Sequence, residues 1–224
     1  MSTYKFLNTM HLPAILNDEI VRLCTFAYYR NLEHKGKVGD PNEGLNILEL
    51  PDYRDSENPV EDQKILSRLA PALVAQSGRG LTVKNLRSVR RFSGYIFCAS
   101  RGSLLRLAND LCHKDPENYD ACYSIFTLQA FAEHLYQHGR IVDDVPLRER
   151  VSSPHIDRVR YTGTTQDVRL GEPEPSSPFV KDAIYSVQRE TRIVFRSVRR
   201  DAPDTISVHA PGIAAFLREQ FRAP

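Results

Sequence analysis

The hydrophobic positions along the chain predict a mixture of short strands and short helices. Compact or alternating apolar runs predict strands over residues 3–7, 20–26, 94–100, 120–126, 157–162, 191–198 and 205–208. Apolar positions three and four residues apart predict helices over residues 11–16, 59–76, 104–111, 128–137 and 211–221. The strands of the last third alternate charged and apolar side chains, as in Arg158-Val159-Arg160-Tyr161, which is typical of antiparallel sheets with one polar face. The pattern favours an α+β fold, mainly antiparallel sheet flanked by helices. The alternation of strands and helices in the first half leaves an α/β fold as the alternative.

Two stretches punctuated by Pro and Gly interrupt these elements. They cover residues 34–59 and 163–178, and their turn residues predict long loops of the kind that form functional lids or surface segments. Neither stretch divides the chain into halves with obvious separate cores, and 224 residues suit one sizeable domain. We therefore expect a single domain over residues 1–224.

Composition narrows the class of protein but not its function. With 41% hydrophobic and 26% charged residues, the chain resembles an ordinary globular protein. No run of about 18 apolar residues predicts a membrane span, and the first ten residues lack the layout of a secretory signal. The four cysteines have no CxxC spacing and no histidine at ligand spacing, so we expect free thiols in a reducing cytoplasm and no metal site.

The charge is nearly balanced but unevenly distributed. A formal net charge of +2 gives no general electrostatic case for nucleic-acid binding. Of the 30 basic residues 23 are Arg, which suits bidentate contacts with phosphate and carboxylate. Two similar basic runs, at residues 87–91 and 196–200, support one hypothesis: a non-enzymatic module that binds a nucleotide or nucleic acid. The alternative is two solvated faces.

One segment, residues 185–195, combines a carboxylate with suitable neighbours. In an extended chain Gln188 and Glu190 project from the same face, where they could grip a sugar hydroxyl and a second substrate. Arg189 and Arg192 flank the carboxylate and are expected to keep it ionised. An ionised carboxylate can stabilise an oxocarbenium-like centre, as in glycosidic bond cleavage. The alternative is a solvent-facing strand with cross-strand salt bridges.

Two resemblances bear on this segment. The late Gln188-x-Glu190, together with a short aromatic first strand at Tyr4-Lys5-Phe6, resembles the ADP-ribosyltransferase superfamily. The chain is also similar, over most of its length, to a family of uncharacterised bacterial proteins with a YKY/YKF-type first strand. Its further features there are the loop Asp40-Pro41-Asn42-Glu43-Gly44 and the segment Lys181…Glu190-Thr191-Arg192. That second family assigns no activity.

The superfamily resemblance implies an ADP-ribosyltransferase-like fold and an NAD-dependent mono-ADP-ribosyltransferase, such as a bacterial toxin or defence effector. NAD would be the co-substrate, and a nucleic acid or a protein the acceptor. Glu190 would bind the nicotinamide ribose and support the developing cation, while Gln188 would orient the acceptor. The resemblance also implies NAD-binding residues. Lys5 would stand in place of the superfamily's first-strand Arg or His, and Thr25 in place of the first member of the superfamily's Ser-Thr-Ser motif. Arg22 or Arg30 would bind the pyrophosphate, and Tyr28 or Tyr29 would stack on nicotinamide.

Overall fold

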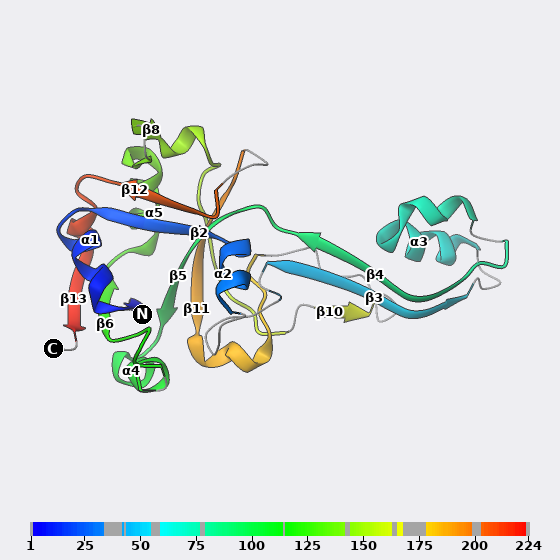
Figure 1. Cartoon of the computed structure of the whole chain (residues 1–224), viewed down its shortest axis with the longest axis horizontal. Coiled ribbons are helices and arrows are strands. Elements are labelled where there is room, and N and C mark those ends of the chain that lie inside the picture. The colour runs from blue at the N-terminus through cyan, green and yellow to red at the C-terminus, as the bar shows by residue number, and fades with distance from the viewer. Residues whose placement is uncertain are drawn as a thin grey trace. The chain divides into compact units, whose positions relative to one another are not determined.

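A computed structural model shows the fold of the chain (Figure 1). It describes all residues except 1, 34–41, 43, 55–58, 77–78, 114, 142–143, 163–164, 168–177, 199–202 and 223–224. The chain forms two compact units. The first unit comprises Met1–Glu43, Ser93–Thr162 and Phe179–Pro224, and the second comprises Gly44–Phe92 and Gly163–Pro178. Compactness alone does not show independent folding, so the single domain over 1–224 stays a prediction, and each unit is described by itself.

The first unit is built on one large antiparallel sheet. Its strands are β1 (Thr3–Leu7), β2 (Ile20–Thr25), β5 (Gly94–Arg101), β6 (Ala121–Ile125), β7 (Arg140–Ile141), β8 (Val145–Pro146), β9 (His155–Arg158), β11 (Glu190–Arg196), β12 (Thr205–His209) and β13 (Leu217–Arg222). Their order is β13-β6-β1-β5-β2-β12-β7-β8, with β11 pairing both β5 and β9. All these described pairs are antiparallel, which confirms the α+β class with mainly antiparallel sheet.

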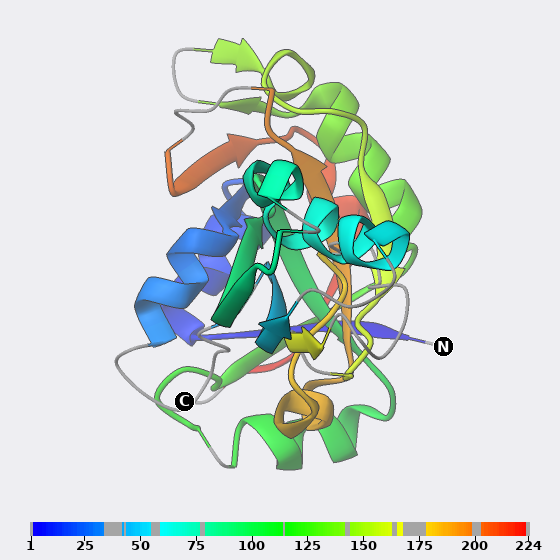
Figure 2. The same ribbon diagram turned by 90° about the vertical axis from the view of Figure 1, so that its right-hand side faces the viewer.

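The helices of the first unit are short. They are α1 (Leu12–Leu16), α2 (Phe26–Glu33), α4 (Leu104–Leu111) and α5 (Leu128–His138), with 3₁₀ helices η1 (Thr9–His11), η4 (Leu147–Glu149), η6 (Ala183–Gln188) and η7 (Ile213–Phe216). Strands lie between α4 and α5 (Figure 2). The helices expected over 11–16, 104–111 and 128–137 are confirmed, and the Asn8 side chain caps η1 by accepting the Met10 N–H at 3.0 Å.

One predicted element of this unit is wrong in kind, and one predicted strand is confirmed with an end one residue earlier. The helix expected over 211–221 is the short η7 followed by β13, because the backbone from Leu217 onward pairs with β6 and Leu217 packs in the core. The strand expected over 20–26 ends at Thr25, and α2 follows at once. Thr25 begins this helix, since its Oγ1 accepts the Tyr28 N–H at 3.1 Å.

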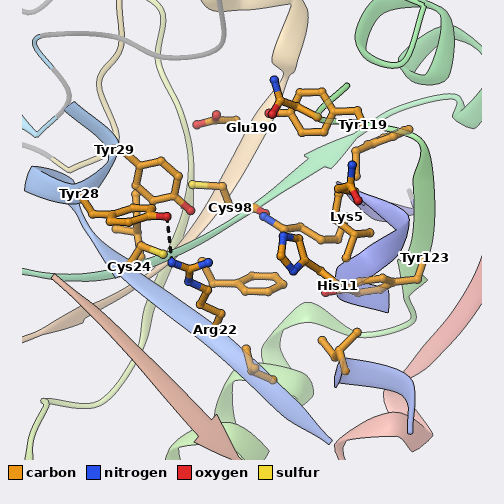
Figure 3. Close-up of a pocket in the computed structure, with 18 of the residues that line it drawn as sticks. Lys5, His11, Arg22, Cys24, Tyr28, Tyr29, Cys98, Tyr119, Tyr123 and Glu190 are labelled. Atoms are coloured by element: carbon orange, nitrogen blue, oxygen red, sulfur yellow. Dashed lines mark hydrogen bonds between the residues drawn. The ribbon is translucent and has the colours of Figure 1, made fainter. Parts of the chain in front are cut away.

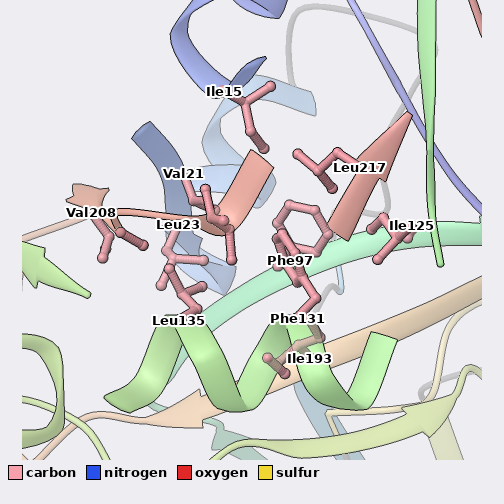
Figure 4. Packing of buried hydrophobic residues seen from close by; sticks show 14 of the residues in the cluster. Ile15, Val21, Leu23, Phe97, Ile125, Phe131, Leu135, Ile193, Val208 and Leu217 are labelled. Atoms are coloured by element: carbon pink, nitrogen blue, oxygen red, sulfur yellow. The ribbon is translucent and has the colours of Figure 1, made fainter. Parts of the chain in front are cut away.

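The main core of the first unit lies between its sheet and α5. Phe131 and Leu135 of α5 are fully buried against Phe97, Ile193 and Val208 of three different strands (Figure 4). The Phe97 and Phe131 rings lie 5.2 Å apart at a tilt of 42°. This packing fixes β5 and β11, whose residues Cys98 and Glu190 line the candidate site.

The second unit is a long hairpin with a helical cap. It contains β3 (Leu45–Arg54), β4 (Thr82–Arg91) and β10 (Thr165–Asp167), with α3 (Pro59–Leu69) and η2 (Pro71–Gln76). β3 pairs antiparallel with β4 and parallel with β10. Leu48, Leu50 and Leu66 are buried together in its small core.

Three predictions for this region are corrected. The loop expected over 34–59 contains β3, whose residues pair with β4 along its length; residues 34–41, 43 and 55–58 lie outside the described part. The loop expected over 163–178 contains β10, and its remainder is mostly outside the description. The helix expected over 59–76 breaks after Leu69, since Pro71 cannot continue the α-helical hydrogen bonds. Among the described helices of both units, none is long and apolar enough to cross a membrane.

Candidate functional site

The candidate site lies where the large sheet splits along one edge of β5. At one end of that strand Tyr95 and Ile96 pair with β2, and at the other end Ser100 and Arg101 pair with β1. β11 occupies the other edge of β5 over its whole length. β1 and β2 therefore diverge around Phe97–Ala99, and no described strand pairs with this edge of β5 between them.

A cavity of about 600 Å³ opens at this split. Its volume falls within the 300–1,000 Å³ typical of small-molecule sites. Figure 3 shows Tyr28 and Tyr29 on one side of the cavity, with Lys5, Tyr119 and Tyr123 across from them. Elements from both ends of the chain build its walls: β1, α1, β2, α2, β5, β6 and the η6–β11 junction.

Glu190 is held by two cations at one wall of this cavity. Lys181 Nζ donates to Glu190 Oε1 at 3.2 Å, while Arg192 Nε and Nη2 donate to Oε2 at 3.0 and 2.9 Å. The side chains of Lys181, Glu190 and Arg192 are only 3%, 11% and 0% exposed. A carboxylate accepts about four hydrogen bonds, so among the described residues these three donors leave one acceptor position, on Oε1.

The charge state of Glu190 follows from this arrangement. Burial by itself would raise the pKa of the carboxyl, but the charges and hydrogen bonds of Lys181 and Arg192 outweigh burial and lower the pKa to about 2. Glu190 is thus ionised at neutral pH, as the sequence predicted. Its partners differ from the prediction: Lys181 takes the place expected for Arg189.

The Gln188 and Glu190 side chains lie close together, but not through strand alternation as the sequence predicted. Gln188 ends the 3₁₀ helix η6, Arg189 adopts the left-handed conformation (φ 46°, ψ 45°), and Glu190 begins β11. The two residues are therefore not on one extended segment, and strand alternation does not align them. Lys181 joins them instead, because its Nζ also donates to Gln188 Oε1 at 2.8 Å.

Two further cations line the cavity. Lys5 Nζ donates to the Cys98 carbonyl at 2.9 Å and lies 5.1 Å from the centre of the Phe97 ring. Arg22 Nη2 donates to the Tyr28 hydroxyl at 2.8 Å. Within the described chain, neither cation forms an ion pair. With Lys181 they place three positive charges against the single carboxylate of Glu190, so the cavity favours an anionic ligand.

The aromatic side of the cavity comes from α2. The Tyr28 and Tyr29 rings meet edge to face, with centres 5.8 Å apart at 83°. Burial raises the pKa of Tyr29 well above its usual range, and nearby Cys98 and Cys24 add to that shift. Burial likewise raises the pKa of Cys24. These groups are therefore neutral at physiological pH and act as apolar or hydrogen-bonding walls.

The structure brings together six of the eight side chains that the sequence singled out. Lys5, Arg22, Tyr28, Tyr29, Gln188 and Glu190 all line the cavity. Thr25 and Arg30 do not. Besides capping α2, the Thr25 hydroxyl donates to Asp204 Oδ1 at 3.1 Å, and Arg30 lies in the last turn of α2.

The sequence reasoning gave no role to several residues that shape the site. Tyr119 and His11 line the cavity, and the Tyr161 hydroxyl accepts the Glu190 N–H at 2.8 Å. Lys181 entered the sequence analysis only as part of a resemblance. Among the residues around Glu190, spacing along the sequence indicates only Arg192. It lies two positions after Glu190, and residues two apart on a strand share a face of the sheet. In the described part of the chain, no cluster of His, Cys, Asp or Glu could hold a metal ion.

The basic runs of the alternative hypothesis lie in different units. Arg87 and Arg91 are exposed on β4 of the second unit, and Arg87 pairs with Glu49 at 3.3 Å. Arg196 is exposed at the end of β11 in the first unit, while residues 199 and 200 lie outside the description.

Comparison with protein-family models, with curated protein sequences and with solved structures finds no match to this chain. What the site can do must be argued from its own residues.

Proposed function

We propose that the first unit binds NAD in the 600 Å³ cavity and cleaves its nicotinamide–ribose bond, as an ADP-ribosyltransferase does. One observation carries this proposal: Glu190, an ionised carboxylate with one open acceptor position, faces a cavity that aromatic and cationic side chains also line. The proposal includes an ADP-ribosyltransferase-like arrangement of the sheet around that cavity.

The residues suit the parts of NAD. The diphosphate carries negative charge, and Lys5 and Arg22 supply cations that no described carboxylate neutralises. The flat nicotinamide and adenine rings fit beside aromatic side chains such as Tyr28 and Tyr29. The open position on Glu190 Oε1 can accept a hydrogen bond from a ribose hydroxyl.

Glu190 would act through its charge. As the glycosidic bond breaks, the ribose develops an oxocarbenium-like cation, and a fixed carboxylate beside it lowers the energy of that state. Because Lys181 and Arg192 hold the carboxylate in place, little reorganisation accompanies the reaction. Gln188 lies next to this centre and would contact the ribose or the attacking group.

The test is nicotinamide release from NAD by the purified full chain, compared with Glu190→Gln. We expect the variant to lose activity on the order of hundredfold, because an electrostatic contact to the transition state is removed. Glu219→Gln is the matched control, since Glu219 pairs with Arg222 at the surface and lines neither this cavity nor its neighbour. Circular dichroism of each variant separates loss of activity from loss of fold.

The same assays also test the alternative hypothesis, a non-enzymatic module that binds a nucleotide or nucleic acid. If the wild-type chain binds NAD or another nucleotide by calorimetry but neither the wild type nor Glu190→Gln releases nicotinamide, the cavity is a binding site without turnover. Equal release by both proteins would refute the role assigned to Glu190. A role as a bacterial toxin or defence effector follows only if turnover is observed.

A further inference from the structure

A second, much smaller cavity adjoins the first. Its volume is about 50 Å³, and the side chains of Glu190 and Gln188 line both cavities. Ser100 and Tyr119 contribute polar groups to its wall. Ser100 lines only the small cavity, whereas Tyr119 lines both.

The size of this cavity matches solvent molecules. A single water needs roughly 10–15 Å³ of such space, so the cavity holds a few waters at most. It has no room for a nucleobase or an arginine side chain. A buried water also needs two to four polar partners, and this site is polar enough to supply them.

The polar groups lie close to the reacting carboxylate. Ser100 of β5 is directly opposite Glu190 of β11 in the sheet register, so the two side chains share a face, with Cβ atoms about 5 Å apart. Ser100 is 7% exposed. Burial, with a further contribution from Glu190, raises the pKa of Tyr119 above its usual range, so its phenol keeps its proton and can donate a hydrogen bond.

We propose that the small cavity holds the attacking water, that Ser100 positions it, and that the enzyme hydrolyses NAD rather than modifying a macromolecule. This inference rests on the proposed function. Gln188, the residue expected to orient an acceptor, is nine-tenths buried and its carbonyl already accepts from Lys181, which argues against a bulky acceptor at this place.

The reaction balances without a further reactant. The bond from ribose C1′ to the nicotinamide nitrogen breaks, and its electron pair stays on that nitrogen, which leaves as neutral nicotinamide. The water oxygen forms the new bond to C1′, and its proton passes to solvent. The products are ADP-ribose, nicotinamide and one proton.

The first experiment identifies the acceptor. NAD labelled in its adenine half is incubated with the full chain, a bacterial lysate and purified RNA, and free ADP-ribose is measured beside label bound to macromolecules. Equal amounts of nicotinamide and free ADP-ribose support hydrolysis. Nicotinamide release with the label on protein or RNA overturns this inference and leaves the proposed function standing. No release at all overturns both.

The second experiment tests the cavity itself with two substitutions. Ser100→Val replaces the hydroxyl by two methyl groups that fill the space, whereas Ser100→Ala removes the hydroxyl and leaves the space open. We expect kcat to fall about hundredfold in the first and about tenfold in the second, with KM little changed because Ser100 does not line the large cavity.

Ser124→Val is the matched control. Ser124 is a strand serine of similar burial, 8% exposed, which lines neither cavity. We expect this variant to keep wild-type kcat for the fraction that is folded. Wild-type kcat in Ser100→Val, or an equal loss in Ser124→Val, would overturn the assignment.

Discussion

The ion cluster around Glu190 makes a quantitative prediction about stability and pH. In the folded chain Lys181 and Arg192 overcome the effect of burial and lower the pKa of Glu190 from 4.5 to about 2. In the unfolded chain these contacts are absent and the carboxyl regains its ordinary pKa. Between these two pKa values the unfolded state binds more protons, so the free energy of unfolding falls as the pH is lowered.

The size of the effect follows from the two pKa values. At about 1.36 kcal/mol per pKa unit, the difference between 4.5 and about 2 corresponds to roughly 3 kcal/mol of stability at neutral pH. This contribution is complete above about pH 5 and is lost as the pH falls toward 2. At about pH 3, about 2 kcal/mol of it has disappeared.

Urea unfolding of the wild type and of Glu190→Gln, followed by circular dichroism between about pH 7 and about pH 3, measures this contribution. The other carboxylates titrate in both proteins, so the difference between the two free energies isolates Glu190. We expect that difference to change by about 2 kcal/mol across the range. The matched control is Glu219→Gln, which removes an exposed ion pair with Arg222. The difference in unfolding free energy between the wild type and this variant should change much less over the same pH range. Parallel curves for wild type and Glu190→Gln would refute a buried, charge-paired carboxylate.

Two further substitutions test the packing around the site. Gly139→Ala would place a methyl carbon against the Leu135 carbonyl oxygen and 2.6 Å from Val208 Cγ1, so we expect destabilisation of about 1–3 kcal/mol in thermal unfolding; an unchanged Tm would contradict this packing. Tyr161→Phe removes the hydroxyl that accepts the Glu190 N–H at 2.8 Å, and should destabilise by about 1–3 kcal/mol in urea while both proteins keep a folded spectrum. An unchanged urea midpoint would show that this hydrogen bond contributes nothing.

Much of the fold of the first unit could be predicted from local patterns. Apolar runs located β1, β5, β6 and β11 to within about two residues, and apolar spacing located α4 and α5. The failures have tertiary causes. Residues 217–222 have apolar positions that suit a helix. In the structure they form β13 instead, because their backbone groups pair with those of β6.

The second unit was harder to predict because its strands carry few local signals. β3 contains Pro51 and Asp52, residues that are rare in strands, and β4 carries several charges. These strands are stabilised by each other and by a small core that includes Leu66 of α3. A long ribbon of this kind is defined by its partner strand, which a single sequence does not reveal.

The candidate site could be predicted in its residue types but not in its geometry. The interpretation of Glu190 as an ionised carboxylate is confirmed, and six of the eight residues singled out line one cavity. Lys181 could not be found by spacing, because the turn of η6 and the left-handed Arg189 bring it back to a residue nine positions later. Such a contact depends on the path of the chain rather than on any period.

The arrangement of charges argues that Glu190 is more than a structural group. Burying two cations and a carboxylate is expensive, and well-packed apolar side chains often stabilise a fold as well or better. Here the carboxylate lies at the boundary between a cavity of nucleotide size and a cavity of solvent size. Lys181 and Arg192 use three of its acceptor positions and leave one directed at neither cation. A purely structural cluster gains nothing from that open position, whereas under the proposed function it would accept a hydrogen bond from a ribose hydroxyl.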